Sequence, residues 1–472
     1  MVQNWTSSDL LLAVDAPLGA GFGRRLQAAL RDAVRAGGLG PGDVLPSTRD
    51  LAAEFDVARG TIVQVYEQLV AEGYFVATPG ARTRVAAYAA STPAQGARDH
   101  AHRLRHDLRP GVPDLSRFPA GDWSWALAEA ARRVRPVDLD YGDARGHPDA
   151  LDAVAAHLRR ARAAAAHPDR LLLGTGFAQC VALAIDVLAA RGVRTLAVED
   201  PGDRSVDEVA RRAGLDLLAI PVDVDGIDVE RLAASGAGAV LVTPAHQSPT
   251  GSVLSPERRT ALVDWAMRTG GWIVEDDYDS EFRYDRQPIG ALQGLAPDHV
   301  LLIGSASKTH APGLRLAWMA VPALLVDEVA AAKRAADRGG TVIDQFAFAL
   351  LIESGRHDRH VRAMRAVYRA RREVLVGALG RAAPDLRLTG LAAGFHGVLA
   401  LPAGRREADV VAAARQRSVH VVGLGASTLG RRDLPPSLVI GFGNIDDEGL
   451  VDAVEHLVAA IGEADDATAR PR

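Results

Sequence analysis

Seven short apolar runs between residues 171 and 321 constrain the fold of this 472-residue chain more than any other feature of its sequence. Segments with helical periodicity separate many of these runs. Strands that are apolar along their whole length are buried on both faces, as in a mostly parallel sheet covered by helices. The sequence therefore predicts an α/β fold for this region. The predicted strands are residues 171–173, 195–198, 217–220, 239–242, 272–274, 300–303 and 317–321.

Polar segments follow four of these runs, at the points where the predicted strands end. In such sheets, ligands bind in the crevice at the carboxyl ends of the strands. The glycine-containing turn at residues 174–179 either presents backbone N–H groups to a phosphate or is only a tight connection. Residues 275–279 hold four acids around one tyrosine; solvated surface acids are the alternative, but a strand this apolar does not usually end in solvent. Residues 243–251 form a polar turn, and residues 304–308 end in a lysine.

Lysine is almost absent from the chain. Only Lys308 and Lys333 occur among its 54 basic residues. A lysine amine can lose its proton and condense with a carbonyl, which an arginine cannot do. A phosphate cradle, a carboxylate, a phenol and a lysine at the strand ends of one sheet are the groups that hold pyridoxal 5'-phosphate (PLP). We therefore predict PLP as cofactor, with Lys308 forming a Schiff base to its aldehyde.

The first 85 residues show a different pattern, with three helical segments followed by a hairpin. Apolar residues at helical spacing predict helices through residues 26–34 and 62–70. Between them, Ser47 stands three residues before Asp50, the capping-box spacing that opens a second, short helix. Residues 74–77 and 82–85 are predicted to be two short strands. Three helices and a hairpin make a winged helix-turn-helix.

The arginines of this first unit lie where a winged helix meets DNA. Arg49 opens the second helix and Arg59 the third, whose outward face also carries Thr61 and Gln64. Those positions face phosphates and base edges in helix-turn-helix proteins. Two more arginines, Arg82 and Arg84, lie on the wing. We therefore predict operator DNA as a partner; a small helical domain with a solvated third helix is the alternative.

Composition sets the remaining expectations. Residues 86–105 are small and polar and predict a flexible linker, so the expected domains are residues 1–85 and 106–472. The N-terminus lacks the features of a signal peptide, and no apolar run is long enough to cross a bilayer, so we expect a cytoplasmic protein with no membrane partner. The single cysteine, Cys180, is expected to be a buried apolar residue. No metal site is predicted, and the net charge of -5 does not indicate a nucleic-acid coat.

Residues 41–75, PGDVLPSTRDLAAEFDVARGTIVQVYEQLVAEGYF, closely resemble the GntR type of winged helix. By its matching positions, this resemblance implies that Arg49, Arg59, Thr61 and Gly80 contact DNA. The sequence departs from the family pattern at Ala58, where a serine is usual. It also departs on the wing, where Arg82 and Arg84 replace the more common glycine and phenylalanine.

The chain from Asp107 onward resembles the fold-type I aminotransferases, and with the preceding domain it resembles the MocR-type transcription regulators. The segments that carry this resemblance are LRPGVPDLSRFP, YGDARGHPDAL, TPAHQSPTG, EDDYDSEFRY and GSASKTHAPGLRLAWM, which begin at residues 108, 141, 243, 275 and 304. The resemblance implies a large domain built on a mostly parallel sheet and a smaller C-terminal α/β subdomain.

The resemblance also implies roles for single residues. Lys308 would form the Schiff base, Asp276 would pair with the pyridine nitrogen and Tyr278 would donate to the ring hydroxyl. The phosphate would be held by Ser305, Arg315 and the backbone of Gly176, Phe177 and Ala178. Tyr141 would reach the phosphate from the neighbouring subunit, which implies a homodimer. His246 is counted with the cofactor-binding residues because it belongs to the TPAHQSPTG segment.

Two departures from the aminotransferase pattern bear on activity. Asp203 stands where an aromatic residue usually stacks on the cofactor ring, and Val439 stands where an arginine usually grips the substrate α-carboxylate. Without that arginine an amino acid loses a charge-assisted anchor, which contributes about 1.5 to 3 kcal/mol. Arg204 and Arg362 are candidate substitutes. We expect a PLP-dependent regulator that senses an amine, an amino acid or PLP itself, with weak or absent transaminase activity. The alternatives are a working aminotransferase with an attached DNA-binding domain and an apo scaffold with a vestigial site.

Overall fold

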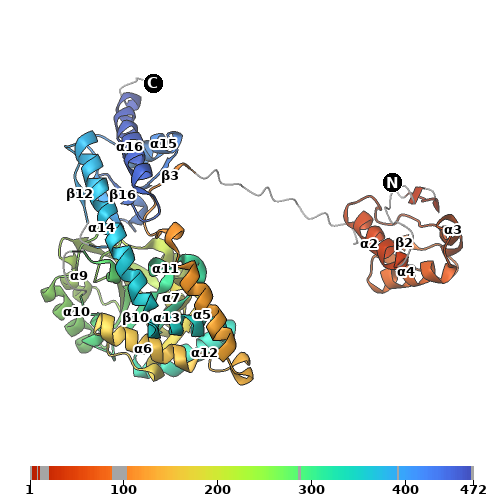
Figure 1. Ribbon diagram of the computed structural model, residues 1–472, viewed down its shortest axis with the longest axis horizontal. Coiled ribbons are helices and arrows are strands. Elements are labelled where there is room, and N and C mark those ends of the chain that lie inside the picture. Colours follow the sequence, from red (N-terminus) through yellow and green to blue (C-terminus); the bar gives the residue numbers. More distant parts are fainter. Residues whose placement is uncertain are drawn as a thin grey trace. The chain divides into compact units, whose positions relative to one another are not determined.

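The computed structural model describes residues 3–7, 9–10, 21–87, 104–284, 289–390 and 393–468. The chain forms two compact units, Met1–His102 and Arg103–Arg472, each with its own core (Figure 1). Most of the predicted linker, residues 88–103, lies outside the described residues. Within the described residues, no helix is long and apolar enough to cross a membrane.

The first unit is a winged helix-turn-helix, as predicted. Its elements are α2 (Phe22–Arg35), α3 (Thr48–Glu54), α4 (Arg59–Ala71), β1 (Phe75–Val76) and β2 (Arg84–Val85). The Ser47 hydroxyl accepts a hydrogen bond from the Asp50 backbone N–H at 3.1 Å, which confirms the N-cap of α3. Leu26, Ile62 and Leu69 pack in the core of the unit. The wing strands pair antiparallel over two residues each, fewer than predicted.

An eight-stranded sheet forms the centre of the second unit, in the order β4-β11-β10-β9-β8-β5-β6-β7. The five strands from β10 to β6 in this order pair parallel, whereas β11 is antiparallel to both its neighbours and β7 to β6. All seven predicted strands are present. The strand bounds are β4 Leu171–Gly174, β5 Thr195–Asp200, β6 Asp216–Asp223, β7 Gly226–Ile227, β8 Ala239–Val242, β9 Trp272–Asp277, β10 Val300–Ser305 and β11 Ala317–Ala320.

Helices cover both faces of this sheet. Successive side chains of a strand point to opposite faces, so each face contributes to a separate core. Leu171 and Leu173 of β4 pack with α5, α6 and α13, whereas Leu172 packs on the other face with α7 and α12. This burial of both faces explains why the strands are apolar throughout. The helices of this layer system are α5 Ala120–Arg133, α6 Pro148–Arg162, α7 Phe177–Ala190, α8 Asp207–Arg212, α9 Val229–Ala234, α10 Pro256–Thr269, α11 Ala306–Thr309, α12 Val326–Asp337 and α13 Val342–Glu353.

A smaller C-terminal subdomain follows, as the resemblance implied. The long helix α14 (Arg356–Ala382) joins it to the large sheet, and Figure 1 shows its elements in blue gathered at one end of this unit. Its four-stranded antiparallel sheet has the order β12-β13-β16-β15. The remaining bounds are β3 His106–Asp107, β12 Leu388–Thr389, β13 His396–Ala400, α15 Glu407–Gln416, β14 Val419–His420, β15 Val422–Gly423, β16 Ser437–Gly441 and α16 Asp447–Thr468.

Candidate functional site

A cavity of about 420 Å³ opens at the carboxyl ends of β9 and β10, beside the first turn of α7. This is the edge of the sheet where the strand-end rule places a ligand site. Residues of the small subdomain and of the loop after β3 close it from other sides. The lining residues are Pro110, Gly111, Phe177, Ala178, Asp203, Ser205, Ser248, Asp276, Tyr278, Ser305, Ser307, Lys308, Pro312, Arg315 and His396.

Lys308 lies in α11, directly after β10, and projects into the cavity. Its Nζ donates a hydrogen bond to the Gly111 carbonyl oxygen at 2.6 Å. Burial lowers the pKa of this amine, and the nearby carboxylates of Asp276, Asp279 and Asp203 offset the effect only in part. The neutral, nucleophilic form of Lys308 is therefore easier to reach than that of a free lysine.

The second lysine has a structural position. Lys333 is fully buried in α12 and donates to the Asp337 carboxylate at 2.6 Å. The same Asp337 oxygen accepts a hydrogen bond from the Gln179 side chain at 2.6 Å, and Gln179 in turn accepts one from the Thr175 backbone N–H at 2.8 Å. Lys333 therefore supports the turn that precedes α7 and does not line the cavity.

That turn forms an anion cradle with Arg315. Gly176 has a φ of +109°, and a Cβ atom there would collide with the Arg315 guanidinium, so only glycine lets the two approach so closely. The first N–H groups of a helix have no partner within the helix, and those of α7 come from Phe177 and Ala178, which line the cavity. Ser305 and Ser307 add hydroxyl groups. A phosphate fits this end of the cavity.

A carboxyl group and a phenol line the cavity at the end of β9. Burial raises the pKa of Asp276 well above its usual range, and Asp203 raises it further, while Lys308 lowers it. The buried Asp276 carboxylate therefore lacks sufficient positive charge around it, and a cation such as a protonated ring nitrogen would stabilise it. Burial likewise raises the pKa of Tyr278 well above its usual value, which keeps it a hydrogen-bond donor.

His246 lies behind Tyr278 and is not among the residues that line the cavity. Its Nδ1 lies 3.0 Å from the Tyr278 hydroxyl and 2.8 Å from Asp279 Oδ2. Burial alone would lower the pKa of His246, but the Asp279 carboxylate outweighs burial and raises it. His246 therefore contacts Tyr278, which lines the cavity, and its own contact with the cofactor stays a prediction.

Asp203 and Val439, the two residues that depart from the aminotransferase pattern, lie in different surroundings. Asp203 lines the cavity, where its carboxylate accepts hydrogen bonds from the Ser205 backbone N–H and hydroxyl at 2.9 and 2.7 Å. Val439 is only 1% exposed and pairs in β16 with Val398 of β13. Val398 stands two residues from His396, so Val439 lies on the sheet face that turns toward the cavity. Neither Arg204 nor Arg362 is among the lining residues, of which Arg315 is the only arginine.

Tyr141 does not line the cavity of its own chain. It is 69% exposed, and the Arg338 guanidinium lies over its ring at 5.6 Å. The residues predicted to contact DNA all belong to the first unit. Arg49, Arg59, Gln64, Gly80, Arg82 and Arg84 are exposed, and Thr61 is half-buried. Arg59 is the first residue of α4, and Arg84 donates to the Gly42 carbonyl oxygen at 3.1 Å.

Comparison with known proteins accounts for both units. The gntR family of bacterial regulatory proteins matches residues 22–85, and the class I and II aminotransferase family matches residues 118–457. The pyridoxine biosynthesis transcriptional regulator PdxR of Corynebacterium glutamicum is 30% identical over 448 residues, which cover 94% of this chain and 96% of PdxR. The chain belongs to the MocR-type transcriptional regulators of the GntR family.

Two further relatives agree with this MocR-type assignment. The probable rhizopine catabolism regulatory protein MocR of Rhizobium meliloti is 31% identical over 79% of this chain and 80% of its own length. The transcriptional regulator TauR of Rhodobacter capsulatus is 33% identical over 77% of this chain and 81% of its own. The family predicted from the sequence is therefore confirmed.

Solved structures bear out the fold of the larger unit of this MocR-type regulator. LysN, an α-aminoadipate aminotransferase from Thermus thermophilus, superposes with a TM-score of 0.69 at 23% identity and covers 76% of this chain and 93% of LysN. Its structure contains N-(5'-phosphopyridoxyl)-L-leucine. The kynurenine aminotransferase of Pyrococcus horikoshii gives a TM-score of 0.68 at 22% identity, covering 76% of this chain and 90% of its own. PLP is the cofactor of this fold, and the cavity with its lysine, anion cradle and buried carboxyl fits it.

Sequence reasoning missed several lining residues of the MocR-type site. His396 comes from β13 of the small subdomain, and its Nε2 has no hydrogen-bond partner within the described residues. Burial lowers the pKa of His396 well below the usual value, and the charges of His246 and Lys308 lower it further. Pro110 and Gly111 reach the cavity from the loop after β3. The strand-end rule could not find these residues, because none of them follows a strand of the large sheet.

Proposed function

We propose that this regulator binds operator DNA as a homodimer and senses a small amine, an amino acid or PLP itself in the cavity around Lys308. One observation carries the sensing role. The cavity has the lysine, carboxyl, phenol and anion cradle for PLP, yet its only lining arginine, Arg315, belongs to the cradle. PLP, when bound, would supply an aldehyde that can react with an amine. Among the described residues that line the cavity, no second arginine is available to orient an α-carboxylate.

Each residue has a defined task in this proposal. Lys308 holds the cofactor covalently, because its neutral amine is accessible. Asp276 pairs with the ring nitrogen, and Tyr278, oriented by His246, donates to the ring hydroxyl. A further group of residues binds the phosphate through hydroxyls, backbone N–H groups and a guanidinium, namely Ser305, Gly176, Phe177, Ala178 and Arg315.

The proposed dimer places Tyr141 in the partner's site. Val137 and Leu139 next to it are 68% and 62% exposed, an unusual clustering of large apolar side chains on a surface. A second subunit would cover this segment and bring the Tyr141 hydroxyl to the neighbouring phosphate. Two winged helices joined in this way bind DNA with a raised effective concentration, and a DNA target places the protein in the cytoplasm.

In the DNA-binding unit, residues 1–85 would carry the contacts with DNA. Arg59, Thr61 and Gln64 at the start of α4 would face base edges, and Arg49 would face a phosphate. Gly80, Arg82 and Arg84 would contact DNA from the wing. Residues 106–472 would carry the cofactor and the dimer contacts.

The test uses the full-length, PLP-loaded protein and an operator selected from random duplexes. DNA affinity and the visible absorption of the cofactor are measured with n-propylamine, β-alanine, L-alanine and free PLP. We expect one or more of these to change the operator Kd by at least about 10-fold, a typical coupling of 1 to 3 kcal/mol. An operator Kd that none of them moves would refute the sensing role.

An active aminotransferase with an attached DNA-binding domain is the second candidate, favoured by the complete set of PLP-holding residues. Transamination needs the substrate held with its Cα–H bond perpendicular to the ring, and Val439 offers no charge for that purpose. On rapid mixing with ordinary L-amino acids, we therefore expect conversion to the pyridoxamine form far below the ~10 per second of a typical enzyme. Conversion near that rate would replace the sensor with the enzyme.

A further inference from the structure

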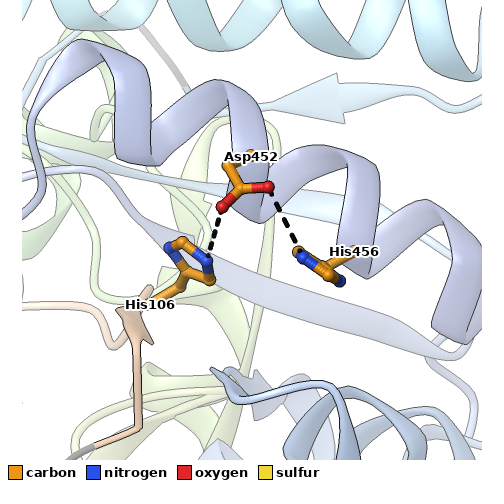
Figure 2. Close-up of side chains that lie close together, drawn as sticks. All are labelled: His106, Asp452 and His456. Carbon is orange, nitrogen blue, oxygen red and sulfur yellow. Dashed lines mark ion pairs between the residues drawn. The ribbon is translucent and has the colours of Figure 1, made fainter.

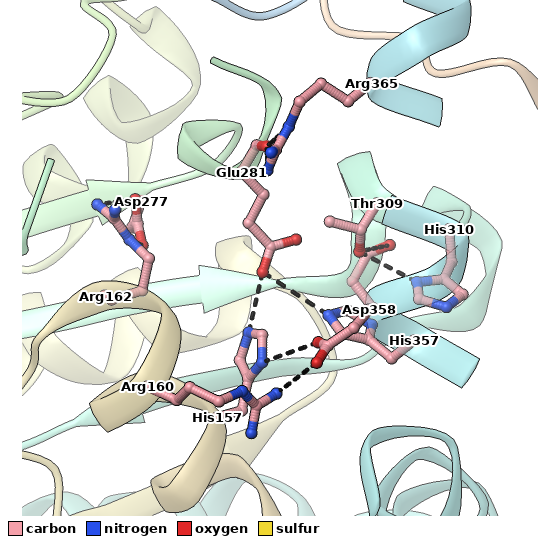
Figure 3. A network of polar contacts seen from close by, with 11 residues as sticks. His157, Arg160, Arg162, Asp277, Glu281, Thr309, His310, His357, Asp358 and Arg365 are labelled. Atoms are coloured by element: carbon pink, nitrogen blue, oxygen red, sulfur yellow. Dashed lines mark hydrogen bonds and ion pairs between the residues drawn. The ribbon is translucent and has the colours of Figure 1, made fainter. Parts of the chain in front are cut away.

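A second cluster of titratable side chains lies outside the cofactor cavity, at the junction of three elements. It comprises His157 of α6, Glu281 of the short helix η5 (Ser280–Phe282) and His357 in the first turn of α14. Figure 3 shows the Glu281 carboxylate directed between the two imidazole rings. None of the three residues lines the cofactor cavity.

The distances in this cluster suit one shared ion. Oε1 of Glu281 lies 2.9 Å from His157 Nε2 and 3.7 Å from His357 Nε2. Zinc binds imidazole nitrogens and carboxylate oxygens at about 2.0 to 2.2 Å in tetrahedral geometry, which places neighbouring ligand atoms ~3.4 Å apart. The two distances lie on either side of that value, so small side-chain shifts would complete the set.

Unpaired polar atoms distinguish this cluster from an ordinary ion pair. His157 and His357 are 2% and 1% exposed. Both ring nitrogens of His357, Nδ1 of His157 and Oε2 of Glu281 have no hydrogen-bond partner within the described part of the chain. Buried polar atoms without partners are costly and rare in folded proteins. A metal ion at the centre of the cluster would give His357 Nε2 and the Glu281 carboxylate a partner.

Hydrogen bonds alone explain the cluster less well than a bound metal ion does. A hydrogen bond between His157 Nε2 and the Glu281 carboxylate accounts for their 2.9 Å contact. His357, however, stays beyond hydrogen-bond distance at 3.7 Å. A metal ion would account for the positions of both histidines, because it would lie between their Nε2 atoms and the carboxylate.

The surroundings are those of a metal site with an open coordination position. Asp358 lies behind His157, with Oδ1 at 4.0 Å from Nδ1, and Arg160 holds that carboxylate at 2.8 Å. The 4.0 Å distance exceeds a hydrogen bond; a small shift of Asp358 toward Nδ1 would let its carboxylate fix the ring orientation, as carboxylates behind ligating histidines commonly do. All three candidate ligands also line a cavity of about 410 Å³, which gives room for a water molecule as fourth ligand.

We propose that His157, Glu281 and His357 bind a divalent transition-metal ion, and that Zn²⁺ is the ion they fit best. No sequence motif indicates this site, because its ligands are far apart in the chain. Bound metal would tie α6 and α14 to η5, whose residues follow Tyr278 closely in the sequence.

Two other clusters of histidines with a carboxylate occur in the described residues, and they are weaker candidates. His246, Asp279 and His396 belong to the cofactor site already described. In the other (Figure 2), Asp452 lies between His106 and His456 at 3.1 and 3.4 Å. Its carboxylate is also paired with Arg105 at 3.1 Å, a cation that competes with a metal. This cluster supplies a matched control.

The experiment uses the full-length, PLP-loaded protein stripped of metal with EDTA. Binding of ZnCl₂ is measured by titration calorimetry, and retained zinc by mass spectrometry after dialysis. We expect one tightly bound ion per chain, and at least a ~100-fold loss of affinity in His357→Ala, because even outer-shell changes cost 10- to 100-fold. The control His456→Ala should bind zinc as the wild type does.

A second variant distinguishes loss of the metal site from misfolding of the protein. Glu281→Gln keeps the size of the side chain and removes its charge, and it should also lose zinc while its circular dichroism stays that of the wild type. Wild-type protein that retains no zinc, or a His357→Ala variant that binds it normally, would overturn the proposal. Loss of zinc in His456→Ala instead would assign the metal to the other cluster. The outcome is independent of DNA binding and amine sensing.

Discussion

In the cofactor cavity, Lys308, Asp276 and Tyr278 have pKa values moved by burial and by one another, so their chemistry is set before any ligand arrives. On the winged helix, by contrast, Arg49, Arg59 and Arg82 project into solvent. An exposed arginine contributes binding free energy only when a phosphate or a base edge is present. A single substitution in the cavity should therefore abolish cofactor attachment. A single substitution on the winged helix should only weaken DNA binding.

The largest expected effect is at Lys308. Lys308→Ala should abolish the visible absorption of the bound cofactor and the covalent trapping of PLP by borohydride, because no other amine lines the cavity. Lys333→Arg is the matched control; it removes the second amine but keeps a cation beside Asp337, so it should leave covalent trapping on Lys308 intact. PLP trapped on Lys333 in the Lys308→Ala protein would show that the site is wrongly assigned.

A graded effect is expected on the DNA-binding surface. Arg59→Ala should weaken operator binding by about 10-fold or more, since an arginine contact to DNA contributes ~1 to 3 kcal/mol, and should leave PLP absorption unchanged. Fluorescence anisotropy over a range of salt concentrations measures both the affinity and the number of phosphate contacts. The control is Arg35→Ala, an exposed arginine that contacts Tyr74 beyond the far end of α4. Equal operator affinity in the Arg59→Ala and wild-type proteins would contradict the placement of the recognition helix.

The smallest expected effect is a displaced pH profile for loading of the cofactor-free protein. Only the neutral amine attacks the PLP aldehyde, so the rate rises with pH and levels off above the pKa of that amine. Burial lowers the pKa of Lys308, so the plateau should begin at lower pH than for Nα-acetyl-lysine amide, whose amine has a pKa of ~10.4. Stopped-flow absorbance measures both profiles, and coincident midpoints would show that burial does not tune this lysine.

The predictability of the two sites differs for a physical reason. The seven strands and the residues that follow β4, β9 and β10 were predictable, because buried strands are apolar and sheets place function at their carboxyl ends. The antiparallel direction of β11 leaves no such trace in composition. His396 enters the cavity from a separate sheet, and its position depends on tertiary packing that local patterns do not encode.

Within the first unit, the helices were predicted closely because their apolar faces and the Ser47 cap are local features. The wing strands were predicted too long, since residues with strand propensity flank a pairing that extends over only two positions. The roles of the site residues in binding PLP and DNA stay predictions. His157, Glu281 and His357 come together only through the packing of α6 and α14 around η5.

Both lysines of the chain are withdrawn from the surface, with Lys333 fully buried and Lys308 half-buried in the cavity. Acylating reagents that label proteins through surface lysines would therefore find few side-chain targets on the folded protein. In the cofactor-free form, the cavity amine would be the one side-chain amine open to small electrophiles. A lysine introduced at the surface would consequently be the main side-chain amine open to an amine-reactive dye once PLP occupies Lys308.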